Sequence, residues 1–226
     1  MFSSFDMLCL THKISDRLEC IYAAYDQSKE TLLLQPLAES FLLPSSLRSV
    51  EHVITYNYDN TLERCLSRLG GTYTSVYSSR TYGSKDEGLR IYHPHGFLPH
   101  PENDPEDHVA QEQTVLTERD YHGQYINIGH WSNVIQSHHF VSRCCLFIGL
   151  SLTDPNVRRI LDYARGEVNS RVAQHIAIQR LGANPVWDAL FEKELLSLGI
   201  HLLWVREYED IPRVLRNCLI KRQGIR

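Results

Sequence analysis

The stretch Val53-Ile-Thr-Tyr-Asn-Tyr-Asp59 decides the fold that this sequence predicts. Its first four residues are β-branched or aromatic, which favours a buried strand. The polar residues Asn57 and Asp59 follow where that strand should end, and a helical pattern then covers residues 60–69. In open α/β sheets, ligands bind at the carboxyl ends of strands, where each strand leads into a helix. A second interpretation needs no ligand, because Asp59 or Asn60 can cap the N-terminus of the helix.

Strand and helix patterns alternate along the chain from residue 52 to residue 219. This alternation predicts an α/β fold with a doubly wound, mostly parallel Rossmann-like sheet and helices on both faces. Residues 1–50 instead predict a helical N-terminal segment, so we expect one compact domain with a main part over 51–226. The expected strands cover 52–56, 72–77, 91–92, 114–117, 144–148, 173–178 and 200–205, and the expected helices cover 13–27, 29–42, 60–69, 121–125, 131–142, 186–198, 209–219 and a segment that starts at 154–155.

Composition excludes several classes of protein. The 226 residues are 42% hydrophobic, which is enough for a core, and the net charge of −4 argues against a protein that binds nucleic acid phosphates directly. No apolar run reaches the ~20 residues of a membrane span, and no basic region precedes the apolar residues at the start. The six cysteines form no C-x-x-C pair, so we expect reduced thiols in the cytoplasm and no bound metal.

Two further polar clusters follow predicted strands. His95 and Gly96 lie just beyond the strand that ends near Tyr92, because Pro94 cannot donate to a ladder. Gly149 and Ser151 follow the apolar strand over 144–148. If the three strands are parallel neighbours, their carboxyl ends place all three clusters in one crevice. His93 and His95 would face opposite sides of a strand, so a metal site built on both is a weaker alternative.

Four segments resemble the sirtuin-like domains of bacterial anti-phage defence. They are Ile54-Thr-Tyr-Asn-Tyr-Asp59, Tyr92-His-Pro-His-Gly96, Val115-Leu-Thr-Glu-Arg-Asp-Tyr121 and Phe147-Ile-Gly-Leu-Ser-Leu-Thr-Asp-Pro155. Their order and spacing match from residue 51 to about residue 220. The resemblance predicts a sirtuin-like Rossmann domain without a zinc module.

The resemblance also assigns residues to a reaction with NAD. It implies that Asn57 and Asp59 lie on the nicotinamide side, that His95 is the catalytic histidine beside Gly96, and that Gly149 and Ser151 approach the ribose and phosphates. The implied activity is hydrolysis of NAD to ADP-ribose and nicotinamide. An amide such as Asn57 can orient a ribose hydroxyl or a water, and a histidine can take the proton of the nucleophile.

Two departures from the family pattern affect this expectation. No glycine precedes Gly70, whereas the family opens with a strand and a glycine-rich loop that holds the pyrophosphate. A truncated gene product, a misassigned start site and a domain that binds the dinucleotide poorly all remain open, and the last favours a degenerate, non-catalytic module that binds NAD, ADP-ribose or a partner. The absence of a four-cysteine zinc module favours NAD hydrolysis over deacylation. Relatives often work as oligomers or as one domain of a longer chain, so a partner domain or a homo-oligomer is expected.

Three other side chains receive structural interpretations. Tyr56 and Tyr58 flank Asn57 and are expected to serve in packing, and His93 is expected to be a capped histidine at the surface.

Overall fold

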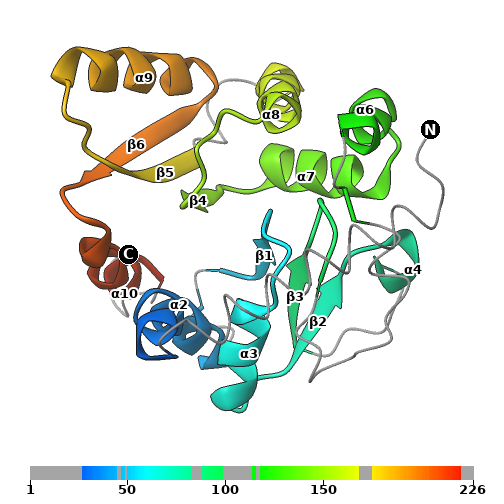
Figure 1. Cartoon of the computed structure of the whole chain (residues 1–226), viewed down its shortest axis with the longest axis vertical. Helices are drawn as coiled ribbons and strands as arrows, with labels where there is room; N and C mark the ends of the chain where they lie inside the picture. The colour runs from blue at the N-terminus through cyan, green and yellow to red at the C-terminus, as the bar shows by residue number, and fades with distance from the viewer. Residues whose placement is uncertain are drawn as a thin grey trace. The chain divides into compact units, whose positions relative to one another are not determined.

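The computed structural model describes residues 27–44, 47–48, 50–82, 88–98, 114–115, 118–167 and 175–219 (Figure 1). Contacts divide the chain into two units. Unit 1 comprises Met1–His122 and Pro212–Arg226, and unit 2 comprises Gly123–Ile211. The helix expected over 13–27 lies outside the described residues except for its last residue.

Unit 1 contains a parallel three-stranded sheet in the order β1-β3-β2. Its central strand β3 is buried along most of its length, which explains why apolar residues dominate it. Ile54 and Val76 both lie opposite Tyr92, so the three strands end at the same level. The elements of this unit are α2 (Gln27–Leu42), β1 (His52–Ile54), α3 (Thr61–Arg68), β2 (Tyr73–Val76), α4 (Ser79–Tyr82) and β3 (Leu89–Tyr92).

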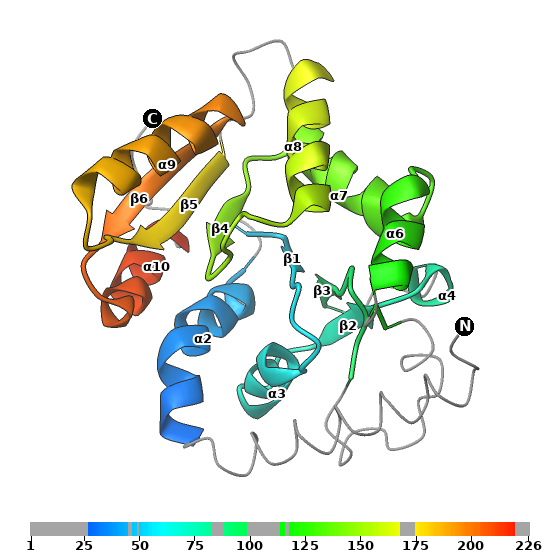
Figure 2. The same ribbon diagram turned by 45° about the horizontal axis from the view of Figure 1, so that its top comes forward.

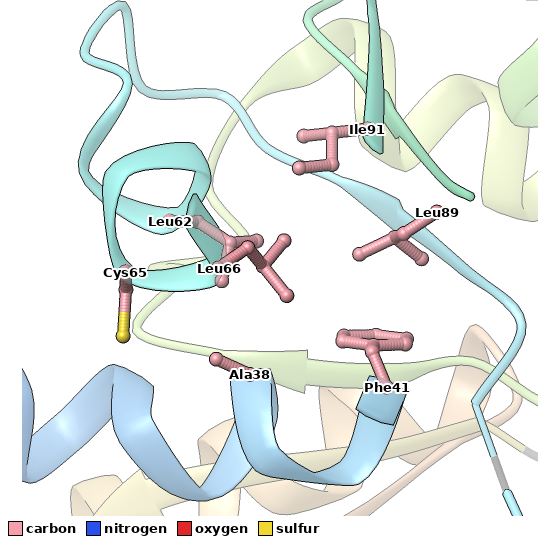
Figure 3. Packing of buried hydrophobic residues seen from close by; sticks show 7 residues of the cluster. All are labelled: Ala38, Phe41, Leu62, Cys65, Leu66, Leu89 and Ile91. Atoms are coloured by element: carbon pink, nitrogen blue, oxygen red, sulfur yellow. The ribbon is translucent and has the colours of Figure 1, made fainter. Parts of the chain in front are cut away.

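The core of unit 1 joins two helices to the central strand. Figure 3 shows Phe41 of α2, Leu62 and Leu66 of α3, and Leu89 and Ile91 of β3 directed toward one another. Leu66 and Ile91 are almost completely buried, at 1% and 0% exposure. This packing fixes the N-terminus of α3 relative to the sheet, and that helix start follows the polar residues predicted to form a site.

Unit 2 contains a second parallel sheet in the order β4-β5-β6. Phe140 of α7 packs edge-on against Phe147 of β4 and His175 of β5, and α7 lies beside α8 (Figures 1 and 2). Helix α9 lies along β6. The elements are α7 (Trp131–Ser142), β4 (Leu146–Ile148), α8 (Pro155–Glu167), β5 (His175–Arg180), α9 (Pro185–Ser197), β6 (Ile200–Val205) and a short 3₁₀ turn, η1 (Tyr208–Asp210), while α6 (Glu118–Ile126) and α10 (Ile211–Leu219) cross the unit boundaries.

The predicted fold class is confirmed, since helices and parallel strands form an open, Rossmann-like α/β arrangement. The described strands form two sheets of three rather than one continuous sheet. The predicted strand over 114–117 is wrong for its described part, because Thr114 and Val115 lie in a loop. Within the described residues, no helix is both long and apolar enough to cross a membrane.

Candidate active site

The carboxyl ends of β1 and β3 bring four predicted site residues to one edge of the first sheet. The last ladder contact joins the Thr55 amide, as donor, to the Tyr92 carbonyl at 2.9 Å. Asn57 and Asp59 then follow β1, and His95 and Gly96 follow β3. Because these two strands are parallel neighbours, both loops leave the sheet at the same edge.

The loop after β1 presents Asn57 and uses Asp59 structurally. Asn57 is exposed, and its backbone amide donates to Thr55 Oγ1 at 3.2 Å. Asp59 is half-buried, and its Oδ1 accepts from the backbone amide of Thr61, the first residue of α3, at 3.0 Å. Asn60 occupies the N-cap position without a side-chain capping bond. The capping interpretation therefore applies to Oδ1 of Asp59, and Asn57 presents an exposed side chain in the same loop.

The loop after β3 is a tight turn that depends on Gly96. Its φ of +106° favours glycine, and a Cβ at this position would lie 2.4 Å from the Cα of Thr114. His95 is half-buried, and its ring meets the ring of Tyr56 edge-on at 5.1 Å between centroids. The neighbouring backbone is also fixed, because the Val115 amide donates to the His95 carbonyl at 2.8 Å.

Tyr58 links the two loops, a role that the sequence did not indicate. Its hydroxyl donates to the Val115 carbonyl at 2.6 Å, and the Val115 amide in turn bonds to His95. The Tyr58 carbonyl accepts from Leu98 at 2.7 Å. Burial raises the pKa of the Tyr58 hydroxyl, so it stays a donor at neutral pH. The packing interpretation of Tyr58 therefore omits a specific hydrogen bond between the loops.

The prediction that His93 lies at the surface is wrong. Its side chain is completely buried, and its Nε2 lies 2.8 Å from Oε1 of Glu63, which is also buried. His93 is the first residue after β3, and the burial of that central strand continues into it. One signal in the sequence marks Glu63 as unusual: it lies beside Leu62 and within the buried stripe of α3, where a carboxylate needs a hydrogen-bond donor or a cation.

Gly149 and Ser151 follow β4, which belongs to the sheet of unit 2. Within unit 1 the structure gathers Asn57, Asp59, His95 and Gly96 at one edge of the sheet, whereas Gly149 and Ser151 belong to unit 2. Gly149 has a φ of +66°, and a Cβ there would meet no atom within 4 Å. Ser151 is exposed, and its Oγ lies 2.8 Å from Thr153 Oγ1. This loop is open enough for a ligand to approach its backbone.

The helix after this loop begins as the sequence predicts. Asp154 Oδ1 accepts from the amides of Asn156 and Val157 at 2.8 and 2.9 Å, and Pro155 is the first helical residue. The capping role predicted for Asp154 is confirmed.

One other feature of the described residues lies apart from the polar loops of unit 1. A groove of ≈ 410 Å³ runs between the C-terminal ends of α2 and α3 and the segments that enter β2 and β3, and its lining includes Pro44, Gly71 and Leu89. It therefore lies at the amino-terminal edge of the sheet, opposite the loops of Asn57 and His95.

No group of three or more His, Cys, Asp or Glu side chains in the described part of the chain is arranged to hold a metal ion.

Comparison with known proteins identifies the family. The model of the SIR2-like domain matches residues 51–203, which is more than half of the chain. The chain belongs to the SIR2-like domain family. The match begins just before β1 and ends within β6, so it includes the candidate loops of both units. The resemblance to sirtuin-like domains is therefore confirmed.

One curated relative has a name that states an enzymatic activity. The chain is 24% identical over 177 residues to a protein named NAD(+) hydrolase ThsA from Acinetobacter baumannii (strain 532279). The alignment covers 71% of this chain and 34% of that protein. The chain thus spans about a third of the length of the relative that it matches.

Proposed function

We propose that this SIR2-like domain hydrolyses NAD to ADP-ribose and nicotinamide, as part of a bacterial defence against phage. The observation that carries the proposal is the placement of an exposed amide, Asn57, and a half-buried imidazole, His95, after two parallel neighbouring strands. The name of the ThsA relative supports NAD as the substrate, and the resemblance of the motifs to defence proteins supports the biological role.

The chemistry suits these side chains. The N-glycosidic bond breaks with its electron pair going to the nicotinamide nitrogen, so the leaving group is neutral and the ribose becomes oxocarbenium-like. Asn57 orients a ribose hydroxyl or the attacking water, and adds no charge that would oppose the developing cation. The oxygen of the water bonds to the anomeric carbon of the ribose, and His95 accepts the proton that this water loses. Asp59, Gly96, Gly149 and Ser151 bind the cofactor in this proposal.

The test is the release of nicotinamide from NAD by the 226-residue chain, normalised to folded protein. General-base catalysis contributes roughly 10²–10⁴-fold, so His95→Ala should lower kcat by about that factor. Asn57→Ala should also lower kcat, through lost orientation. His201→Ala and Asn217→Ala are matched controls, because both side chains are exposed and lie outside the candidate loops. Equal turnover in wild type and His95→Ala would contradict the proposed role of His95.

A second candidate function is a binding module without turnover. The segment that precedes the family match favours this function. Residues 1–50 contain no glycine and so offer no Gly-x-Gly loop for the pyrophosphate. Calorimetry with NAD and with ADP-ribose separates the two functions. Binding without nicotinamide release would support the module, and release that depends on His95 would support the hydrolase.

A further inference from the structure

Glu63 places a carboxylate inside unit 1. It lies on the first turns of α3 and is 1% exposed. Its Oε1 accepts from Ser75 Oγ of β2 at 2.9 Å and lies 2.8 Å from Nε2 of His93. Its Oε2 is buried and has no hydrogen-bond partner among the described residues. One oxygen of this side chain therefore connects α3 with β2 and with the end of β3.

His93 faces oxygen atoms with both ring nitrogens. Nε2 points at Glu63 Oε1, and Nδ1 lies 3.4 Å from the backbone carbonyl oxygen of Asn57. A carboxylate oxygen and a carbonyl oxygen only accept, and histidine donates from both nitrogens only as the imidazolium ion. The geometry therefore fits an imidazolium whose charge is balanced by Glu63.

The position of the His93 ring is fixed from several directions. Its backbone amide donates to the Val76 carbonyl at 2.8 Å, and its carbonyl accepts from Gly96 at 3.1 Å. The Phe97 ring lies 4.4 Å from the imidazole, and Phe97 is itself stacked on Tyr77. The ring thus has little freedom to move away from the Asn57 carbonyl.

A gain in folding stability does not by itself explain why the protein contains a buried ion pair. Taking two charges out of water costs free energy, and well-packed apolar side chains often replace a buried ion pair without loss of stability. The contacts of this pair are instead specific to the candidate site. His93 is two residues ahead of His95 in the chain, and its Nδ1 faces the residue proposed to orient the ribose.

We propose that Glu63 and His93 are positioning residues for the hydrolysis of NAD, because their buried ion pair fixes the Asn57 backbone relative to the turn that carries His95. This inference rests on the proposed function. Both side chains of the pair are buried, and the proposed function gives neither of them a contact with NAD. It acts by holding the two candidate catalytic side chains at one separation, and a small misplacement of reacting groups can cost a large factor in rate.

The first measurement is the turnover of Glu63→Gln. The amide has the same shape and still accepts from Ser75, but it carries no charge to balance an imidazolium. His93 then keeps one ring proton, and its donation to the Asn57 carbonyl is lost. We expect kcat for nicotinamide release to fall by between about tenfold and about 100-fold. KM should stay within about twofold, because no group that contacts NAD in the proposal is removed.

Two further variants separate positioning from a general loss of structure. His93→Gln keeps a donor toward Glu63 and removes the second ring donor, so it should lower kcat by a similar factor. The double variant should be about as slow as either single variant, because both act through one pair. Glu194→Gln is the matched control, since this carboxylate pairs with Arg158 on the surface of unit 2. It should leave turnover unchanged, and all rates are normalised to folded protein.

The second measurement does not depend on activity. Nitrogen-15 NMR of the histidine rings should show two protonated nitrogens in His93 of the wild type and one in Glu63→Gln. A single protonated nitrogen in the wild type overturns the ion pair at any turnover. If the wild type is active and Glu63→Gln is equally active, only the positioning role fails. If the wild type releases no nicotinamide while the His93 spectrum is as expected, the proposed function fails and the positioning role fails with it.

Discussion

Two glycines of the candidate loops, Gly96 and Gly149, differ in the space around their Cα atoms. Gly96 turns the chain against the backbone of Thr114, with a φ of +106°. Gly149 also has a positive φ, but the space beside its Cα is open. The first glycine is needed by the protein itself, whereas the second leaves room for something else to approach.

This contrast predicts different consequences for one added methyl group. Gly96→Ala should destabilise unit 1 by about 1–3 kcal/mol, because strain at positive φ is combined with a clash against backbone. Gly149→Ala should cost about 1–2 kcal/mol in unit 2, from the left-handed conformation alone. Hydrogen exchange resolved by residue measures the loss in each unit. If Gly149 approaches NAD as proposed, its methyl group should also weaken NAD binding in calorimetry, and unchanged affinity would contradict that role.

At the scale of elements, strand pairing in unit 2 depends on a buried histidine. His175 begins β5, and its Nδ1 accepts from the backbone amide of Cys145 at 3.2 Å, just before β4. The aromatic rings of Phe140 and Phe147 surround the imidazole. Burial lowers the pKa of His175, so the neutral ring is the form that the folded protein stabilises.

The stability of this pairing should therefore depend on pH. The contribution of the neutral ring is fully present above the unfolded pKa of about 6.5, and it is lost as the pH falls from there through the lowered folded pKa. His175→Asn keeps an oxygen acceptor for Cys145 but does not titrate. Urea unfolding at pH 7.5 and pH 5.5 should show a smaller loss of stability for this variant than for the wild type. Equal losses in the two proteins would show that the protonation of His175 is not linked to folding.

The elements also show what the sequence can predict. Apolar runs bounded by polar residues predicted both bounds of β6, and the Asp-Pro pair at 154–155 predicted the start of α8, because these signals are local. The strand predicted over 173–178 corresponds to β5, which continues two residues further, to Arg180. The end of β1 was predicted two residues too late, since its length depends on its neighbour. After Tyr92 the partner strand leads into Pro94, which offers no amide hydrogen for a ladder.

The site was partly predictable, because some of its signals are local in the sequence. Asn57 and His95 stand after apolar strands, so their shared edge follows from pattern and parallel pairing. Their supporting contacts are long-range. The buried stripe of α3 marks Glu63 as unusual, but no local pattern indicates which residue it pairs with. The bond from Tyr58 to Val115 spans 57 residues, and the pairing of Glu63 with His93 spans 30.

At the scale of the whole molecule, the division into two units predicts that a core substitution acts unevenly. Leu66 is 1% exposed and packs among α2, α3 and β3 in unit 1. Leu66→Ala should destabilise unit 1 by about 2–5 kcal/mol, as for other buried leucines. Amide protection should therefore fall more in unit 1 than in unit 2. Leu196→Ala is the control, because this side chain is 47% exposed on α9. An equal fall in both units would show that they unfold together.

The tryptophan side chains of the protein all belong to one of the two units. All three tryptophans, Trp131, Trp187 and Trp204, belong to unit 2, whereas Asn57 and His95 belong to unit 1. Trp187 is 68% exposed, so its emission should be red-shifted and readily quenched by acrylamide. Intrinsic tryptophan fluorescence is thus an optical probe of the unit that carries Gly149 and Ser151. Damage confined to the unit of the candidate catalytic residues would be spectroscopically silent at those wavelengths, and it has to be followed by circular dichroism or by the tyrosines.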